Sequence, residues 1–410
     1  MFPIIKIKFI LIAAIFLAMP FAAGADTLLE KRDFFVDSVY DSTARNKITA
    51  VLQNITNKIY FYFDDEWWES LDIEKRKEVN VAISDLNQEF ENKIYPILTS
   101  VYGSEWKPGI DNDERITILV HPMIGGAAGY FNPGDEYPKA QVSTSNQREM
   151  VYLNSRYIAS PLNKSFFAHE FTHLITFNQK DRTYGISEET WLNEARAEYS
   201  PSLLGYDKVY QGSNLQRRVE QFLGTPQDSL TEWQGKSSDY GALNLFTQYL
   251  VDHYGFSILA ESLKTNKIGI TSLNYILQKK GFIEDFSQIF TNWTIAIFIN
   301  NCAAGVQYCY LNDNLKDLKI TPFIYFLPTA GNSTLNVGYL TKDWAGNWQK
   351  IIGGRTSLRL EFTGGSANVN FKVPYIVEGP QGVFSVKFFN NSLALSITNC
   401  LLLTRTSSIL

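Results

Sequence analysis

The chain has 410 residues, of which 45% are hydrophobic and 14% aromatic, and its formal net charge is -5. This length allows two or three domains with a sizeable core, and the composition is typical of a globular chain rather than a disordered one. A mildly acidic chain without a long basic run argues against nucleic acid as a partner.

The first 25 residues have the features of a secretory signal peptide. Lys6 and Lys8 form a basic start, residues 9–21 are nearly all apolar, and Ala-Gly-Ala at residues 23–25 fits an A-x-A cleavage site. An uncleaved membrane anchor is the alternative, but the apolar run is short for a span. We therefore expect a secreted protein, extracellular or periplasmic, that starts near Asp26 and has no stable membrane span. The sequence does not predict an oligomeric state.

The next part of the chain is read from its hydrophobic pattern. Residues 26–57 are polar, and we interpret them as a lead-in or a removable propeptide. Alternating apolar residues predict strands at 58–63, 115–120 and 149–153, and helical spacing predicts a helix over 73–100. Asp-Asn-Asp-Glu at residues 111–114 could bind Ca²⁺, but it lacks the Gly and the distal Glu of an EF-hand. A solvated turn is the simpler interpretation.

Residues 169–173 read His-Glu-Phe-Thr-His, which is an H-E-x-x-H pattern. Residues four apart lie on one face of a helix, so His169 and His173 could bind the same Zn²⁺ ion. Glu170 would then lie beside the ion, placed to take a proton from a metal-bound water. A buried structural pair of histidines is the alternative. However, the chain has only four His, and two of them are in this pattern. We interpret His121, at the end of the 115–120 strand, as a structural histidine.

A third ligand is available on the segment Trp-Leu-Asn-Glu-Ala-Arg-Ala-Glu-Tyr, residues 191–199. A catalytic zinc ion takes three protein ligands and leaves its fourth position to water. Glu194 is the candidate for the third ligand. Glu198 follows one helical turn later, where it could accept a hydrogen bond from a ligating His and fix its ring and tautomer.

His-Glu-Phe-Thr-His followed by this second segment resembles the gluzincin metallopeptidases, whose third ligand is a Glu on the next helix. Gly-Tyr-Phe-Asn-Pro-Gly-Asp at 129–135 and Asp-Tyr-Gly-Ala at 239–242 are similar to hyicolysin-like secreted bacterial peptidases. The resemblance implies a zinc-dependent endopeptidase acting on protein or peptide substrates, with Glu170 as general base. It also implies that the 149–153 strand holds extended substrate by backbone pairing. The G-x-M-E-N signature of the related aminopeptidases is absent.

The resemblance further suggests Tyr240 as the donor that stabilises the tetrahedral oxyanion. An aromatic packing role for Tyr240 stays open, and His253 and Tyr184 are other candidate donors. Two other function classes also stay open. One is a secreted binding or adhesion protein with a vestigial zinc site, and the other is a zinc hydrolase acting on glycan or lipid.

The sequence pattern of the second half of the chain changes at about residue 323. Helical patterns at 240–253, 258–263, 270–278 and 282–300 give way to short β-prone runs separated by Gly and Asn. We therefore predict an α+β protein. A zincin catalytic domain at 58–322, with a mixed sheet, the H-E-x-x-H helix and an α-helical half, precedes a small all-β, sandwich-like domain at 323–410. Cys302 and Cys309 could close a small loop, which would leave Cys400 free and buried.

Overall fold

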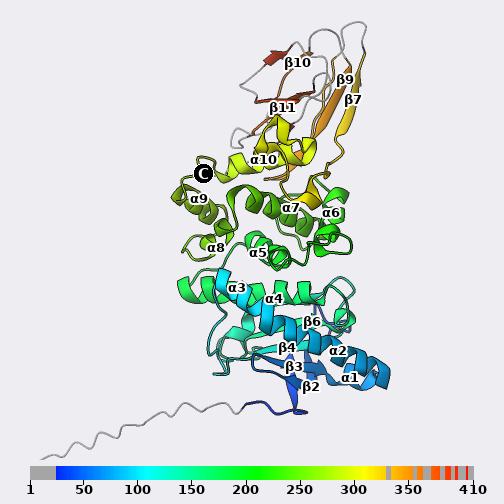
Figure 1. Cartoon of the computed structure of the whole chain (residues 1–410), viewed down its shortest axis with the longest axis vertical. Coiled ribbons are helices and arrows are strands. Elements are labelled where there is room, and N and C mark those ends of the chain that lie inside the picture. The colour runs from blue at the N-terminus through cyan, green and yellow to red at the C-terminus, as the bar shows by residue number, and fades with distance from the viewer. Residues whose placement is uncertain are drawn as a thin grey trace, which may run out of the picture.

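The computed structural model describes residues 25–328, 334–353, 358–362, 371–378, 384–388, 393–395 and 403–404. It is a mixed α+β structure in which a sheet, several layers of helices and a group of short strands follow one another along the long axis (Figure 1). The predicted signal peptide, apart from residue 25, and Cys400 lie outside the described residues. None of the helices in the described ranges is long and apolar enough to cross a membrane.

The sheet has six strands in the order β1-β2-β3-β4-β6-β5. The strands β3, β4 and β6 are parallel, whereas β1, β2 and β5 are antiparallel to their neighbours. The strands predicted at 58–63, 115–120 and 149–153 are confirmed as β3, β4 and β6. The bounds are Lys31–Phe35 (β1), Lys47–Ile55 (β2), Ile59–Asp64 (β3), Ile116–His121 (β4), Gly129–Tyr130 (β5) and Met150–Asn154 (β6).

Both faces of the sheet are covered, which explains why its central strands are buried along their whole length. Successive side chains of a strand point to opposite faces. Phe61 and Phe63 of β3 therefore join the core beneath the helices, while Tyr60 and Tyr62 join a second core on the other face.

The segment 26–57, interpreted from the sequence as a lead-in or propeptide, forms part of this sheet. Its strands β1 and β2 pair with each other, and β2 pairs with β3. Phe34, Ile48 and Leu52 from these strands are buried in the second core. The sheet therefore begins at Lys31, well before the strand at residues 58–63.

The H-E-x-x-H segment lies in helix α4 (Asn163–Phe177), which packs on the sheet together with α2 (Ile73–Glu89) and α3 (Tyr95–Tyr102). A π-helical turn, Phe90–Ile94, joins α2 to α3 within the predicted 73–100 helix. Phe90 stacks on Phe167 with 4.7 Å between ring centres and meets Phe171 edge-on at 5.1 Å. Because α4 is enclosed by the sheet and other helices, its histidines have a rigid support. The short α1 (Asp65–Ser70) follows β3.

A second layer of helices covers α4 on the side away from the sheet (Figure 1). Residue Gly241 of α7 lies against the backbone of α6, where a Cβ atom would come within 2.6 Å of the Phe222 nitrogen. This close approach places α6 and Tyr240 side by side. The helices predicted after the zinc motif are confirmed as α5 (Thr190–Leu203), α7 (Ser237–Tyr254), α8 (Ser257–Leu263), α9 (Gly269–Lys279) and α10 (Phe286–Ile299). Helix α6 (Asn214–Gly224) was not predicted from the sequence.

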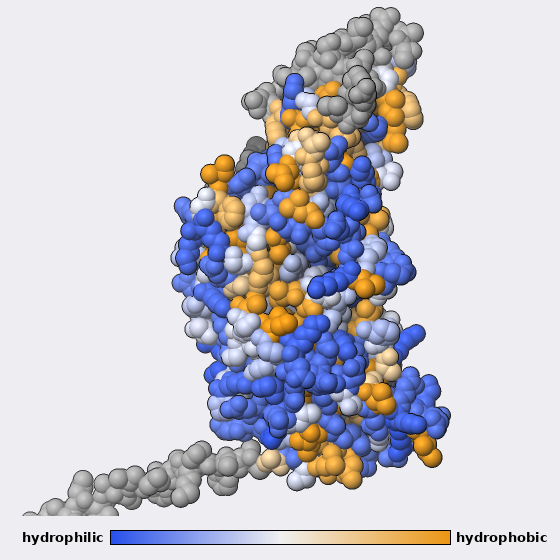
Figure 2. Space-filling view, in the orientation of Figure 1, coloured by the Kyte–Doolittle hydropathy of each residue, from blue (hydrophilic) through white to orange (hydrophobic). Residues whose placement is uncertain are grey.

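The described strands after residue 323 form four two-stranded pairs, namely β7 with β9, β8 with β14, β10 with β13 and β11 with β12. Trp348 donates from its indole nitrogen to the carbonyl of Thr294 at 2.8 Å, so this region shares a core with α10. Figure 2 shows hydrophobic surface over β7, where Phe326 is 74% exposed. The sandwich arrangement stays a prediction. The bounds are Phe323–Leu327 (β7), Gly346–Asn347 (β8), Gln349–Gly353 (β9), Leu358–Leu360 (β10), Pro374–Glu378 (β11), Phe384–Phe388 (β12), Leu393–Leu395 (β13) and Leu403–Thr404 (β14).

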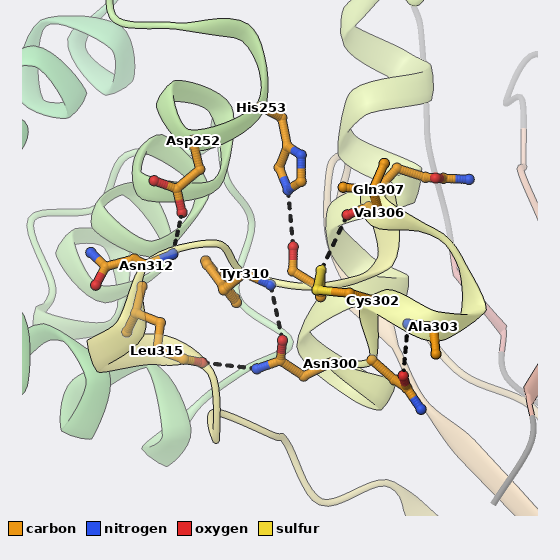
Figure 3. Close-up of a disulfide and its surroundings, with 12 residues drawn as sticks. Asp252, His253, Asn300, Cys302, Ala303, Val306, Gln307, Tyr310, Asn312 and Leu315 are labelled. Carbon is orange, nitrogen blue, oxygen red and sulfur yellow. Dashed lines mark hydrogen bonds between the residues drawn. A yellow bond between two sulfur atoms is a disulfide. The ribbon is translucent and has the colours of Figure 1, made fainter.

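Cys302 and Cys309, the pair that could close a small loop, form a disulfide just beyond α10 (Figure 3). The loop that it closes is tied to the end of α7, because His253 Nε2 lies 2.9 Å from the carbonyl oxygen of Cys309. The backbone N–H of Asn312 donates to Asp252 at 3.0 Å in the same place. His253 is therefore engaged here and does not line the cavity that holds the H-E-x-x-H residues.

Candidate metal centre

Helix α4 brings the two histidines of the motif together on one face. The Nε2 atoms of His169 and His173 are 3.1 Å apart, and their ring centres are separated by 4.8 Å. Donor atoms of His169, Glu170 and His173 all lie within 4.8 Å of one another. Among the described residues, no group of three or more His, Cys, Asp or Glu side chains that could hold a metal ion was found away from this helix.

Glu194 reaches the same point from α5. Its two carboxylate oxygens lie 3.2 Å from His169 Nε2 and 3.6 Å from His173 Nε2. Zinc–ligand bonds of about 2.0–2.1 Å in tetrahedral geometry separate neighbouring donor atoms by about 3.3 Å. The separations of the two imidazole nitrogens from each other and from the nearest Glu194 oxygens are therefore close to those of a tetrahedral site, and the residues present fit a zinc ion.

The other nitrogen of each imidazole ring has an oxygen partner. His169 Nδ1 lies 3.1 Å from Glu198 Oε1, and His173 Nδ1 lies 3.1 Å from Asn193 Oδ1. A carboxylate oxygen can only accept, so the Nδ1 of His169 carries a proton, which leaves Nε2 as the nitrogen that would bind a metal ion. Two imidazole nitrogens and a carboxylate that converge on one point require a cation or protons between them.

Arg218 on α6 supports this arrangement and was not identified from the sequence. Its Nε donates to Glu198 Oε2 at 2.7 Å, and its Nη2 donates to the other oxygen of the same carboxylate. Its guanidinium also lies over the ring of Tyr240, 4.4 Å from the ring centre. The sequence does place Arg218 at an apolar position of an amphipathic helical pattern, between Leu215 and Phe222. This pattern indicates that Arg218 is buried, but it does not identify Glu198 as its partner.

The electrostatics of the cluster follow from burial and charge. Burial lowers the pKa of His169, but hydrogen bonds to Glu194 and Glu198 outweigh it and raise the pKa to about 10. Burial raises the pKa of Glu194, but His173 and His169 outweigh it and lower the pKa to about 2. Burial dominates at Glu170 and raises its pKa above the ordinary value.

The strand beside Glu170 is β5, not the 149–153 strand that the sequence suggested as the edge. Strand β6 has β4 on one side and β5 on the other, so β5 ends the sheet. A Cβ atom at Gly129 of β5 would come within 2.6 Å of the Tyr152 carbonyl oxygen and 3.0 Å of Glu170 Cγ. Glycine therefore lets this strand pass directly over Glu170. Two residues are too few for a strand pattern to be recognised in a sequence.

A cavity of 260 Å³ opens onto the centre. It contains Tyr240, whose ring centre is 6.4 Å from that of His169 and which meets Trp233 edge-on at 4.8 Å. The structure thus brings together all the residues predicted for the site, whereas Tyr184 and His121 lie elsewhere. The lining residues are Tyr40, Gly129, Tyr130, Phe131, Pro133, His169, Glu170, His173, Thr176, Phe177, Asp181, Ser187, Glu188, Asn193, Glu194 and Tyr240.

Two other predicted polar features have structural partners. His121 is fully buried, and its Nδ1 lies 3.3 Å from Asp41 Oδ2. In the segment considered for Ca²⁺, the Asp113 carboxylate accepts from the Tyr60 hydroxyl at 2.7 Å and pairs with Arg115 at 3.1 Å. Asp111 accepts from the backbone N–H of Asp113 at 3.0 Å, as in a turn.

The chain matches no protein-family model and no curated protein. Among solved structures, it is similar to a metallopeptidase from Bacteroides thetaiotaomicron, with a TM-score of 0.27 and 9% sequence identity. The match covers 84% of this chain and 64% of that protein, so this chain spans less than two thirds of its length. A likeness this slight defines neither the fold nor the function.

Proposed function

We propose that the chain is a secreted zinc-dependent endopeptidase of the gluzincin type. The observation that carries this proposal is the arrangement of His169, His173 and Glu194, whose donor atoms are 3.1 to 3.6 Å apart and converge on one point. These three residues would hold the zinc ion. Glu198 would fix the ring and tautomer of His169, and Arg218 would fix Glu198 in turn.

When bound, zinc supplies a Lewis acid that makes water a stronger nucleophile and polarises a scissile carbonyl. Glu170 is the general base in this proposal. Its side chain is buried beside both histidines, so its carboxylate can accept a proton from the attacking water and pass it to the leaving amine. Burial raises the pKa of Glu170, which makes its carboxylate a stronger base for the first of these steps.

Tyr240 is the proposed donor to the tetrahedral oxyanion. It lines the cavity next to His169, and burial raises the pKa of its phenol, which therefore keeps its proton. A hydroxyl held in place before the reaction stabilises developing negative charge without reorganisation. Trp233 and Arg218 pack on its ring and would hold it in place.

Strand β5 offers a way to hold an extended peptide. It ends the described sheet, and Gly129 passes over Glu170. A substrate strand that pairs with the outer edge of β5 would have its scissile bond brought near Glu170. The disulfide and the predicted signal peptide support an oxidising, extracytoplasmic location.

The test is hydrolysis of casein by the zinc-loaded chain beginning at Asp26. We expect cleavage that a chelator abolishes and added zinc restores, and that Glu170→Gln abolishes while zinc content stays at one ion per chain. Glu74→Gln, an exposed change on α2, is the matched control and should keep full activity. Cleavage that persists in Glu170→Gln would rule out the proposed base. A zinc-loaded protein without activity would favour the vestigial-site alternative, and a panel of glycan and lipid substrates would test the other hydrolase class.

A further inference from the structure

Tyr40 lines the cavity that holds His169, Glu170 and Glu194, although it comes from the segment 26–57. It lies in the connection between β1 and β2, about 130 residues before the zinc motif in the sequence. No motif marks it, because its place in the site depends on how the N-terminal strands join the sheet.

The backbone around Tyr40 is fixed by hydrogen bonds to the segment that follows β4. The N–H of Ile124 donates to the Tyr40 carbonyl at 2.9 Å, and the N–H of Ser42 donates to the Pro122 carbonyl at 3.1 Å. The neighbouring Asp41 is 2% exposed and accepts from Arg45 Nη2 at 2.9 Å. The connection between β1 and β2 is therefore held against the segment that follows β4.

The ring of Tyr40 extends a stack of aromatic side chains out of the sheet. Tyr40 stacks on Tyr130 with 4.7 Å between ring centres, and Tyr130 stacks on Tyr152 at 4.1 Å. Tyr130 belongs to β5, the strand proposed to pair with substrate. Tyr40 consequently lies beside the path of an extended peptide.

The phenol of Tyr40 is suited to donate a hydrogen bond. Burial raises its pKa, and the carboxylates of Glu170 and Asp37 raise it further, so the hydroxyl keeps its proton. Within the described part of the chain, the Tyr40 hydroxyl has no hydrogen-bond partner, unlike that of Tyr130, which accepts from the N–H of Asp37 at 3.1 Å. A donor that faces a cavity without a partner is available to a ligand.

We propose that Tyr40 is a substrate-binding residue that donates a hydrogen bond to a peptide carbonyl beside the scissile bond. This inference rests on the proposed peptidase function. It follows that residues 26–57 belong to the catalytic unit and are not a removable propeptide. The site is then closed by tyrosines from two distant parts of the chain, Tyr40 from the N-terminal segment and Tyr240 from α7.

The first test is kinetic. Tyr40→Phe removes only the hydroxyl, so the ring stack and the midpoint of thermal unfolding should be unchanged. We expect kcat/KM for a peptide substrate to fall by about 5- to 50-fold, the range for losing one hydrogen bond to substrate. Tyr275→Phe, at a tyrosine of α9 that is 43% exposed, is the matched control and should match the wild type. Unchanged kcat/KM in Tyr40→Phe would overturn the inference.

The second test does not depend on turnover. In the Glu170→Gln background, an uncleaved peptide should bind about tenfold more weakly when Tyr40→Phe is added, as measured by calorimetry at constant zinc content. Equal affinities would contradict the inference even if the wild type proved inactive. If the wild type binds no peptide and cleaves none, the proposed function fails, and the role of Tyr40 fails with it.

The third test concerns the segment itself. The intact mass of the active secreted enzyme should correspond to a chain that begins near Asp26 and keeps Tyr40. An active form that begins after residue 57 would contradict the inference while leaving the proposed peptidase function in place.

Discussion

His169 Nδ1 lies 3.1 Å from Glu198 Oε1, while Nε2 of the same ring lies 3.2 Å from Glu194 Oε2. One imidazole ring thus contacts two carboxylates that are one turn apart on α5, and each carboxylate lies next to a different ring nitrogen. This relationship separates the two acids into a ligand and an orienting partner. It also makes the ring orientation dependent on Glu198.

Glu198→Gln should weaken zinc binding by about 10- to 100-fold, the usual cost of losing an orienting carboxylate. The amide keeps the volume of the side chain but no longer fixes the imidazole by a charge-assisted hydrogen bond. Competition with a chromogenic chelator would measure the change. Glu261→Gln, on the partly exposed surface of α8, should leave the affinity unchanged. Equal affinities for wild type and Glu198→Gln would show that the charge of the Glu198 carboxylate is not needed to orient His169.

Arg218→Met should lower the free energy of unfolding of the zinc-free protein by about 3–5 kcal/mol. Arg218 is 6% exposed and Glu198 is 1% exposed, so removing one partner leaves a buried charge without its counter-ion. Arg218→Lys should lower the free energy of unfolding by a smaller amount, because a lysine restores the charge but not the contact through two nitrogens. Urea denaturation of both variants would measure these changes. Equal losses in both variants would mean that packing, rather than charge, explains the contribution of Arg218.

Stability should also fall as the pH rises toward neutrality and above, because of Glu149. Burial raises the pKa of Glu149 to about 7, and the buried carboxyl of Glu136 interacts with it. The folded state therefore keeps a proton that the unfolded chain releases near its ordinary pKa of 4.5. A group of this kind favours folding at low pH, and its contribution is lost as the pH rises through about 7.

Glu149→Gln should remove this part of the pH dependence. The side-chain oxygen can still accept from the N–H of Ile110, which donates to Glu149 at 2.8 Å, and the new amide N–H group can donate to Glu136. Comparison of unfolding midpoints at pH 5 and pH 8 would measure the effect. We expect the unfolding midpoint of the variant, relative to that of the wild type, to be higher at pH 8 than at pH 5. A parallel pH profile for the two proteins would contradict the assignment.

Replacing both Cys302 and Cys309 with Ser should lower the free energy of unfolding by about 2 kcal/mol, the chain-entropy cost of a short closed loop. The loop lies far along the helical half from α4 (Figure 1). Zinc affinity and kcat/KM should therefore stay at wild-type values at a temperature where the variant is folded. Denaturation and activity measured on the same preparation would separate the two effects. A loss of zinc affinity would show that the end of α7 is coupled to the metal centre.

The metal centre could be predicted to a large extent because its residues are close in sequence. The spacing of His169, Glu170 and His173 places them together on any α-helix, whatever its surroundings. Glu194 and Glu198 were found because a catalytic zinc ion needs a third protein ligand, and their common face again follows from four-residue spacing. Long strands and helices were also predictable, since the hydrophobic period of each element is local.

The remaining features depended on tertiary structure. Arg218, Tyr40 and Gly129 reach the centre only because distant segments pack together, and no local pattern records which partner a buried Arg or an aromatic residue will meet. The membership of residues 26–57 in the sheet was missed because polar residues at the outer strands obscure the alternation. The sequence by itself thus determined the metal-binding face of α4 and the acidic face of α5. Only the tertiary structure decided what surrounds them, because burial and partner choice are set by long-range packing.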